Sequence, residues 1–206
     1  YSGMTNTIHM INLDYSGGAG TNYLQYWRSQ DGGATFDIQQ AGLPGLDTAG
    51  GYSFMQADAY AMAAQDSLVA IVAGAGVTDL AVWVSRENGD SATWTRTRIM
   101  DFPIPNFDGN TITDLDGDGV ADNVETTDDS HSILIDNNGM IHVWSGAMII
   151  IDDVAGDEQW SFLPATSGMW YWNESFGPDS VMYLDLLLDW DITGNAADGI
   201  GADVAN

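Results

Sequence analysis

Short apolar runs alternate with polar and glycine-rich segments along most of the chain. Examples are SLVAIVAG at 67–74, DLAVWVS at 79–85, SILID at 132–136 and MIHVWSG at 140–146. Runs of roughly four to eight such residues, bounded by Gly, Asn, Asp and Ser, are typical of β-strands joined by tight turns. The alanine-rich segment at 58–67 has some helical character, but its resemblance to a later hairpin favours a strand. The pattern therefore predicts an all-β protein.

Two pairs of segments resemble each other, which indicates a weak internal repeat. The segment AYAMAAQDSLVAIVAG at 59–74 matches HSILIDNNGMIHVWSG at 131–146, since both read as strand, polar turn, strand. The segment YWRSQDGGATF at 26–36 matches VWVSRENGDSATW at 82–94, where a strand leads into an acidic, glycine-containing turn. Repeated antiparallel units predict a β-propeller of four-stranded antiparallel blades. A β-sandwich, which also contains many short strands, is the alternative.

We expect residues 1–206 to form a single domain, either a propeller or an incomplete section of a larger one. The segment at about 106–130 is expected to be an insertion between two hairpin units. The chain begins with Tyr1 and shows no signal peptide, so we expect a processed or trimmed part of a longer precursor. No apolar run approaches the roughly 18 residues that a membrane-spanning helix needs.

The charge balance narrows the possible partners. The chain has 30 acidic residues against 4 basic ones, for a formal net charge of -26. A chain this negative repels phosphate backbones and anionic membrane surfaces, so we expect cations rather than nucleic acid or membranes as partners. The absence of cysteine excludes disulfides, thiolate metal sites and a cysteine nucleophile.

One turn matches the pattern S-x-D-x-G-x-T-[W/F] at every defined position. Its defining residues are Ser29, Asp31, Gly33, Thr35 and Phe36. The Asp31 side chain can accept hydrogen bonds from backbone N–H groups across the turn, and Gly33 can take a positive φ. Thr35 would start the next strand, and Phe36 would pack between sheets.

This motif is similar to the Asp-box, or BNR repeat, of the β-propeller superfamily that includes the sialidases. A degenerate copy keeps Ser85, Glu87, Gly89, Thr93 and Trp94, with two extra residues. The resemblance extends over about residues 23–146. It implies a propeller fold in which the Asp-box is a structural turn on the blade rim, away from any active site.

The same resemblance bears on catalysis. Sialidases of the family bind a carboxylate substrate with three arginines from different blades and use a Tyr/Glu nucleophile pair with an acid Asp. Here Arg86, Arg96 and Arg98 fall in one short stretch, and Arg28 adjoins the Asp-box. Pro103 stands where the family's F-R-I-P segment has its arginine. We therefore assign no catalytic residue, and a sialidase-like glycoside hydrolase with catalytic residues partly outside this chain is the alternative function.

The stretch TDLDGDGVADNVE at 113–125 has the spacing of a D-x-D-x-D-G-x5-E calcium loop. The candidate ligands are the side chains of Asp114, Asp116, Asp118, Asp122 and Glu125 and the backbone carbonyl of Val120. Calcium prefers six to eight hard oxygens at about 2.3–2.6 Å, and this spacing wraps carboxylates around one ion. The flanks do not look helical, so the sequence predicts an EF-hand-like or dockerin-like loop embedded in a β-protein. A solvated acidic turn is the alternative.

The segment SGMWYWNES at 167–175 places two indoles on one strand face and a phenol on the other. Trp170 and Trp172 share a face, and Tyr171 takes the opposite one. Exposed aromatic rings of this kind can stack on sugar rings, so Trp170 and Trp172 are candidates for glycan binding. Packing in the core is the alternative interpretation.

Together these features predict a secreted or cell-surface β-propeller stabilised by calcium. We expect it to act as a binding or structural module, with a glycan or another protein chain of a surface assembly as its partner. Enzymatic activity is not the expected function.

Overall fold

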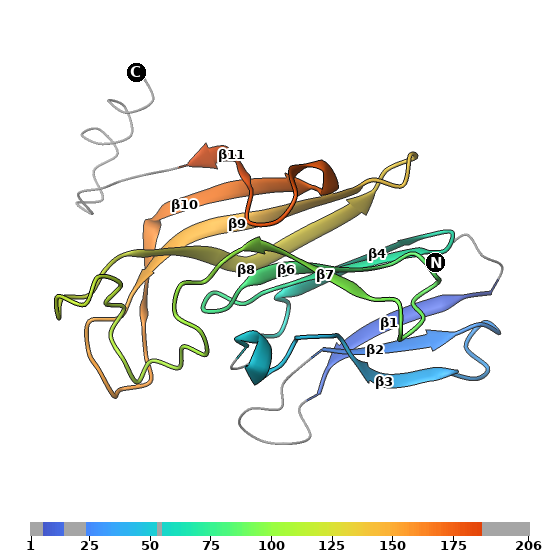
Figure 1. Cartoon of the computed structure of the whole chain (residues 1–206), viewed down its shortest axis with the longest axis horizontal. Helices are drawn as coiled ribbons and strands as arrows, with labels where there is room; N and C mark the ends of the chain where they lie inside the picture. Colours follow the sequence, from blue (N-terminus) through green and yellow to red (C-terminus); the bar gives the residue numbers. More distant parts are fainter. Residues whose placement is uncertain (1–5, 15–23, 53–54, 187–206) are drawn as a thin grey trace.

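A computed structural model describes residues 6–14, 24–52 and 55–186 of the chain. The described strands form three antiparallel sheets, and no α-helix occurs in this part of the chain. Each sheet is a meander whose strands follow one another in chain order, and none of the sheets closes into a barrel. Figure 1 shows the sheets stacked as three layers, with the middle layer between the other two. The all-β prediction is confirmed.

The three sheets take up successive parts of the chain. The N-terminal sheet contains β1 (Ile8–Leu13), β2 (Leu24–Ser29) and β3 (Ile38–Gly42). The central sheet contains β4 (Tyr60–Gln65), β5 (Leu68–Ala73), β6 (Leu80–Ser85) and β7 (Thr95–Met100). The C-terminal sheet contains β8 (Val124–Ile135), β9 (Ile141–Ile151), β10 (Ser161–Asn173) and β11 (Met182–Leu186). Two short 3₁₀ turns, η1 (Thr48–Gly50) and η2 (Glu174–Phe176), lie in connecting segments.

The central sheet is covered on both faces, which explains why its inner strands are almost entirely apolar. Every residue of β5 and β6 is buried. Side chains at alternate positions point to opposite faces of a sheet. Ile71 and Trp83 therefore pack toward the N-terminal sheet, and Val72 and Val82 pack toward the C-terminal sheet. A strand buried on both faces reads as a continuous apolar run, as residues 68–73 and 80–84 do.

Two apolar clusters fill the spaces between the layers. The cluster beside the N-terminal sheet contains Leu24 and Tyr26 of β2 together with Trp83 of β6. The cluster beside the C-terminal sheet contains Trp170 and Trp172 of β10. Burying one such side chain contributes about 1.5–3 kcal/mol, so the two clusters are the main source of stability of the stack.

Two polar contacts also join the central and C-terminal sheets. The hydroxyl of Thr126 on β8 donates to the Gly76 carbonyl at 2.8 Å. The Nε2 atom of His131 lies 2.7 Å from the Gly74 carbonyl. A carbonyl only accepts, so Nε2 carries the proton, and Nδ1 accepts from the Ser145 hydroxyl at 3.0 Å. Burial lowers the pKa of His131, which favours this neutral tautomer.

The repeated segments occupy equivalent places in different sheets. Segments 59–74 and 131–146 form the first hairpin of the central and C-terminal sheets, respectively. Segments 26–36 and 82–94 each begin in a strand and continue into the turn that leads to the last strand of its sheet. Segment 58–67 contains strand β4, so the preference for a strand over a helix is confirmed.

Substitution of Gly89 tests how tightly the N-terminal and central sheets are packed. Its φ is 72°, and a Cβ at this position would collide with the hydroxyl of buried Tyr26. Gly156 also has a positive φ, of 85°, but has open space around it. Alanine at either position costs about 1 kcal/mol in backbone strain, and overpacking at Gly89 adds about 1–3 kcal/mol. Urea denaturation should therefore show Gly89→Ala clearly less stable than Gly156→Ala, and equal stabilities would contradict this packing.

Candidate functional site

The acidic loop lies in the connection between the central and C-terminal sheets. Residues 101–123 link β7 to β8, and β8 begins at Val124, so the irregular segment ends earlier than the predicted insertion. Thr113 holds the base of the loop. Its hydroxyl donates to the Asp122 carbonyl at 2.7 Å, and its N–H donates to the Asp152 carbonyl at 3.0 Å. The Asp122 N–H donates to the Thr113 carbonyl at 2.6 Å, which closes the two ends of the loop together.

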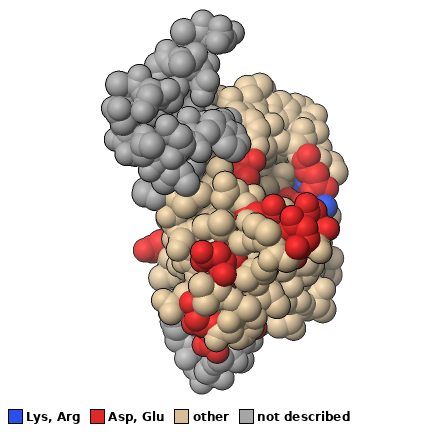
Figure 2. Space-filling view, turned by 90° about the vertical axis from the view of Figure 1, so that its left-hand side faces the viewer, with Lys and Arg blue, Asp and Glu red and all other residues tan. Residues whose placement is uncertain are grey.

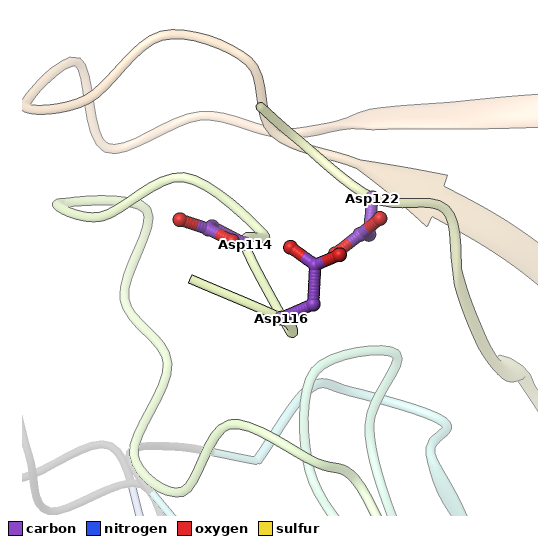
Figure 3. Close-up of side chains that lie close together, drawn as sticks. All are labelled: Asp114, Asp116 and Asp122. Atoms are coloured by element: carbon purple, nitrogen blue, oxygen red, sulfur yellow. The ribbon is translucent and has the colours of Figure 1, made fainter. Parts of the chain in front are cut away.

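Three of the predicted ligands converge. Carboxylate oxygens of Asp114, Asp116 and Asp122 lie within 4.8 Å of one another. Figure 3 shows Asp114 and Asp116 on one segment of the loop, with Asp122 on the segment beside it. No other group of three His, Cys, Asp or Glu side chains comes this close in the described ranges. These oxygens are the hard ligands that Ca²⁺ and Mg²⁺ prefer, and the group contains no nitrogen or sulfur ligand.

Backbone amides shape the loop around these carboxylates. The N–H groups of Gly117 and Gly119 donate to the two oxygens of Asp114 at 2.7 and 3.0 Å. Both glycines have positive φ, of 81° and 85°, which lets the chain turn sharply. The Leu115 N–H donates to Asp122 at 2.7 Å. These bonds offset part of the repulsion between the carboxylates.

The other predicted ligands lie outside the converging group. The Asp118 carboxylate accepts from the Val120 N–H at 2.8 Å, and Val120 is 65% exposed. The Glu125 carboxylate accepts from the Tyr183 hydroxyl of β11 at 2.7 Å instead of closing the loop. The structure therefore brings together three of the five carboxylates that the spacing predicted.

The surroundings of the loop are strongly acidic. Figure 2 shows the end of the molecule that carries this loop, where acidic side chains are scattered over the surface and little basic surface is visible. Such a field raises the local concentration of cations.

The Asp-box turn between β2 and β3 has a complete set of internal hydrogen bonds. The Ser29 hydroxyl accepts from the Gly33 N–H at 2.8 Å and donates to Asp31 at 2.9 Å. The Thr35 N–H and hydroxyl donate to the two Asp31 oxygens at 2.8 and 2.7 Å. These bonds, led by that of the Thr35 N–H, hold the pKa of Asp31 at about 2. The hydrogen bonds of these residues stay within the turn itself.

The degenerate turn repeats part of this arrangement. Ser85 accepts from the Gly89 N–H at 3.0 Å, as Ser29 does from Gly33, and lies 2.7 Å from the Thr93 hydroxyl. Trp94 after this turn is buried and contacts Tyr26 edge to face. Phe36 after the first turn is only half-buried and stands edge to face with Trp27. The expectation that Phe36 packs between sheets is therefore corrected, because it lies outside the clusters between the layers.

All four arginines are paired with carboxylates. The ion pairs are Arg28–Asp37, Arg86–Glu174, Arg96–Asp79 and Arg98–Asp179. Arg96 and Arg98 line one hollow of about 310 Å³ together with Asp79 and Asp101. The acids in this hollow neutralise the two guanidinium groups, so it does not attract an anionic substrate strongly.

The structure corrects the interpretation of Trp170 and Trp172. Each is about 2% exposed in the cluster between the central and C-terminal sheets, so neither offers a ring face to a sugar. Three half-buried aromatic side chains lie on the opposite face of the same sheet. They are His142, Trp144 and Tyr171. Alternation in MIHVWSG could have identified Trp144, since Ile141 and Val143 share one strand face and His142 and Trp144 share the other.

An irregularity in β8 produces a half-buried carboxylate. Asp129 has a φ of 67°, and its Oδ1 atom is buried without a hydrogen-bond partner among the described residues. Burial raises the pKa of Asp129 to about 6, although the Gly76 N–H donates to the carboxylate. Strained backbone and a desolvated charge occur together at functional sites, and no sequence motif marks this position.

No protein family, no curated protein and no solved structure matches this chain. In the described ranges, no helix is long and apolar enough to cross a membrane.

Substitution of Asp31 tests the role of the Asp-box turn. Asp31→Ala removes the acceptor of three hydrogen bonds, so we expect a lower melting temperature with no change in cation binding by the distant acidic loop. The contribution of the carboxylate is complete above its unfolded pKa of about 3.9 and is lost as the pH falls toward 2. Thermal melts and metal titrations measure the two properties separately. Loss of cation binding would contradict this division of roles.

Asp129 predicts a distinctive pH dependence. Its folded pKa of about 6 lies above the unfolded value of about 3.9, so the folded state binds more protons between these values. Stability from this group therefore falls as the pH rises from about 4 to about 6, by no more than about 3 kcal/mol. Asp129→Asn should remove this loss in chemical denaturation at a series of pH values. If the free energy of unfolding changed with pH in the same way in both proteins, Asp129 would not be the source of the loss of stability.

Proposed function

We propose that the chain is a calcium-stabilised section of an Asp-box β-propeller that acts as an extracellular or cell-surface binding module. The observation that carries this proposal is the convergence of Asp114, Asp116 and Asp122 in a loop whose base is fixed by buried Thr113. Three carboxylates supply hard oxygens and negative charge for Ca²⁺, and water or loop carbonyls would complete its coordination.

The position of the loop gives the ion a structural role. The loop joins β7 of the central sheet to β8 of the C-terminal sheet, so an ion bound there restrains the connection between two layers. A ligand that binds only the folded state stabilises it by mass action. The large negative charge of the chain suits a calcium-rich, high-salt setting outside the cell, where screening weakens self-repulsion.

The propeller assignment is supported by the resemblance between successive sheets. Each sheet is an antiparallel meander, and Asp-box-like turns precede the last strand of both the N-terminal and central sheets. β4 and β8, the first strands of two successive sheets, also lie against each other. Neighbouring blades of a propeller have this relationship. A β-sandwich accounts less readily for three layers in which the middle sheet is doubly covered.

A sialidase-like glycoside hydrolase remains the second candidate function, and one observation favours it. Arg96 and Arg98 line the same hollow, beside Phe102 and Ile104 of the FPIP segment. Their pairing with acids and the presence of Pro103 argue for the binding module. Hydrolysis of an aryl sialoside by the purified chain would favour the enzyme.

Calcium should raise the melting temperature, and a chelator should reverse the effect. An ion at about a hundredfold excess over its Kd adds about 2.7 kcal/mol. For a chain of this size that corresponds to a rise of roughly 5–10 °C. Asp116→Asn should abolish most of this rise, because it removes one of the converging carboxylates. Differential scanning calorimetry with and without Ca²⁺ measures the effect.

Asp157 provides a matched control. Both Asp116 and Asp157 are exposed, and each accepts a hydrogen bond from the N–H two residues further on. Asp157→Asn should therefore leave the response to calcium intact. An unchanged melt of the wild-type chain on adding Ca²⁺ or chelator would refute the structural ion.

A further inference from the structure

The outer face of the C-terminal sheet carries a regular arrangement of side chains. Val143 of β9 is buried against the central sheet, so its neighbour Trp144 points away from it. The strand register places Ser132 of β8 on one side of Trp144 and Tyr171 of β10 on the other. In the next row of this face, Met169 of β10 lies opposite Gly146 of β9. The row therefore lacks a side chain at its centre.

Both neighbours of β9 deviate from regular pairing close to this gap. On β8, residues 128–130 bulge out where the partner strand has only Gly146. On β10, residues 164–167 bulge out opposite residue 148. Bulges re-aim side chains and are frequent beside binding sites. The Asp128 carboxylate lies over Gly146 so closely that a Cβ there would collide with it.

The result is an open hollow of about 310 Å³. Its lining includes Asp128, Ser130, Ser132, Trp144, Gly146 and Met169. This volume is at the lower end of the range for small-molecule sites, roughly 300–1,000 Å³, and suits one ring-sized ligand. An indole with a few polar groups around it is the usual composition of such a site.

Several polar groups in the hollow have no protein partner. Asp128 Oδ1 accepts from the Ser130 N–H at 2.9 Å, and Oδ2 has no partner in the described ranges. Within the same ranges, the hydroxyls of Ser130 and Ser132 are also without partners, and both residues are exposed. One strong acceptor and two hydroxyls are therefore free to bind a ligand.

The indole is held in place by its neighbours. The ring of Trp144 lies 6.1 Å from that of His142, at an interplanar angle of 20°, and 5.4 Å from that of Tyr171. His142 Nδ1 is 2.7 Å from the Tyr171 hydroxyl, which also accepts from Asn173 at 3.0 Å. A ring fixed in this way loses little entropy when a ligand stacks on it.

We propose that this hollow binds an uncharged pyranose ring of a glycan. The apolar C–H face of the sugar would lie against Trp144, and its hydroxyls would donate to Asp128 and exchange hydrogen bonds with Ser130 and Ser132. The free carboxylate and the charge of -26 disfavour acidic sugars. This assignment rests on the proposed role as a binding module and names its ligand, but it does not require calcium.

A second sheet or another protein could also cover this face, since Leu134 and Met169 are 51% and 45% exposed. The free polar groups argue against an apolar cover. Burying Asp128 Oδ2 and the two serine hydroxyls without partners would cost several kcal/mol. A sugar, in contrast, supplies hydroxyls to each of them.

The test is titration of the whole chain with the methyl glycosides of glucose, galactose, mannose and N-acetylglucosamine. Saturation-transfer NMR detects weak binding, and isothermal titration gives Kd. Trp144→Ala should weaken binding of the preferred glycoside by roughly tenfold or more, because the stacking face is lost. Asp128→Asn, which keeps the shape of the side chain, should also weaken binding. The matched control is Trp27→Ala, an indole of the N-terminal sheet outside the hollow.

Loss of binding in both hollow variants with retention in the control supports the proposal, provided that circular dichroism shows folded protein. If Trp144→Ala does not fold, Asp128→Asn alone decides. The proposal is overturned if no glycoside binds at millimolar concentrations, or if both hollow variants bind as well as wild type. It is also overturned if sedimentation shows a dimer that Trp144→Ala disrupts while no sugar binds. Calorimetry with and without Ca²⁺ does not depend on sugar binding, so the proposed ion site and the proposed glycan site can be refuted separately.

Discussion

Burial of both faces of the central sheet is the constraint on which the structure depends. β5 and β6 present apolar side chains to both the N-terminal and the C-terminal sheet. Loss of either outer sheet would therefore expose one of the two apolar clusters to water. The hydrophobic effect scales with the apolar area removed from water, and here one sheet contributes to two interfaces. The outer faces of the stack, in contrast, are free to carry polar and aromatic groups.

The distribution of charge then determines which ligands the surface can attract. The four arginines are used in ion pairs, so most of the surface charge is negative and uncompensated. The acids of the β7–β8 connection are drawn together because Thr113 and Asp122 close the base of that loop. The cation candidate and the glycan candidate thus occupy different surfaces, one on a loop between layers and one on an outer sheet face.

Short-range hydrogen bonds and ligand spacing could be predicted from the sequence, but which face of each strand is buried could not. The hydrogen bonds of Ser29, Asp31 and Thr35 span a few residues and follow from the motif. The calcium-loop spacing predicted Asp114, Asp116 and Asp122, but Glu125 is taken by Tyr183 of β11, far away in the sequence. Trp170 and Trp172 were correctly placed on one strand face, yet that face is the buried one.

The sequence by itself determined the strands, the turns and the all-β class, because alternation, glycine and aspartate act within a few residues of the chain. Only the tertiary structure decided which side of each strand is covered. A period of two defines two faces but does not say which of them meets another sheet. The bulge at residues 128–130, the half-buried carboxylate of Asp129 and the hollow beside Trp144 also required the fold, since they arise where the pairing between strands is irregular.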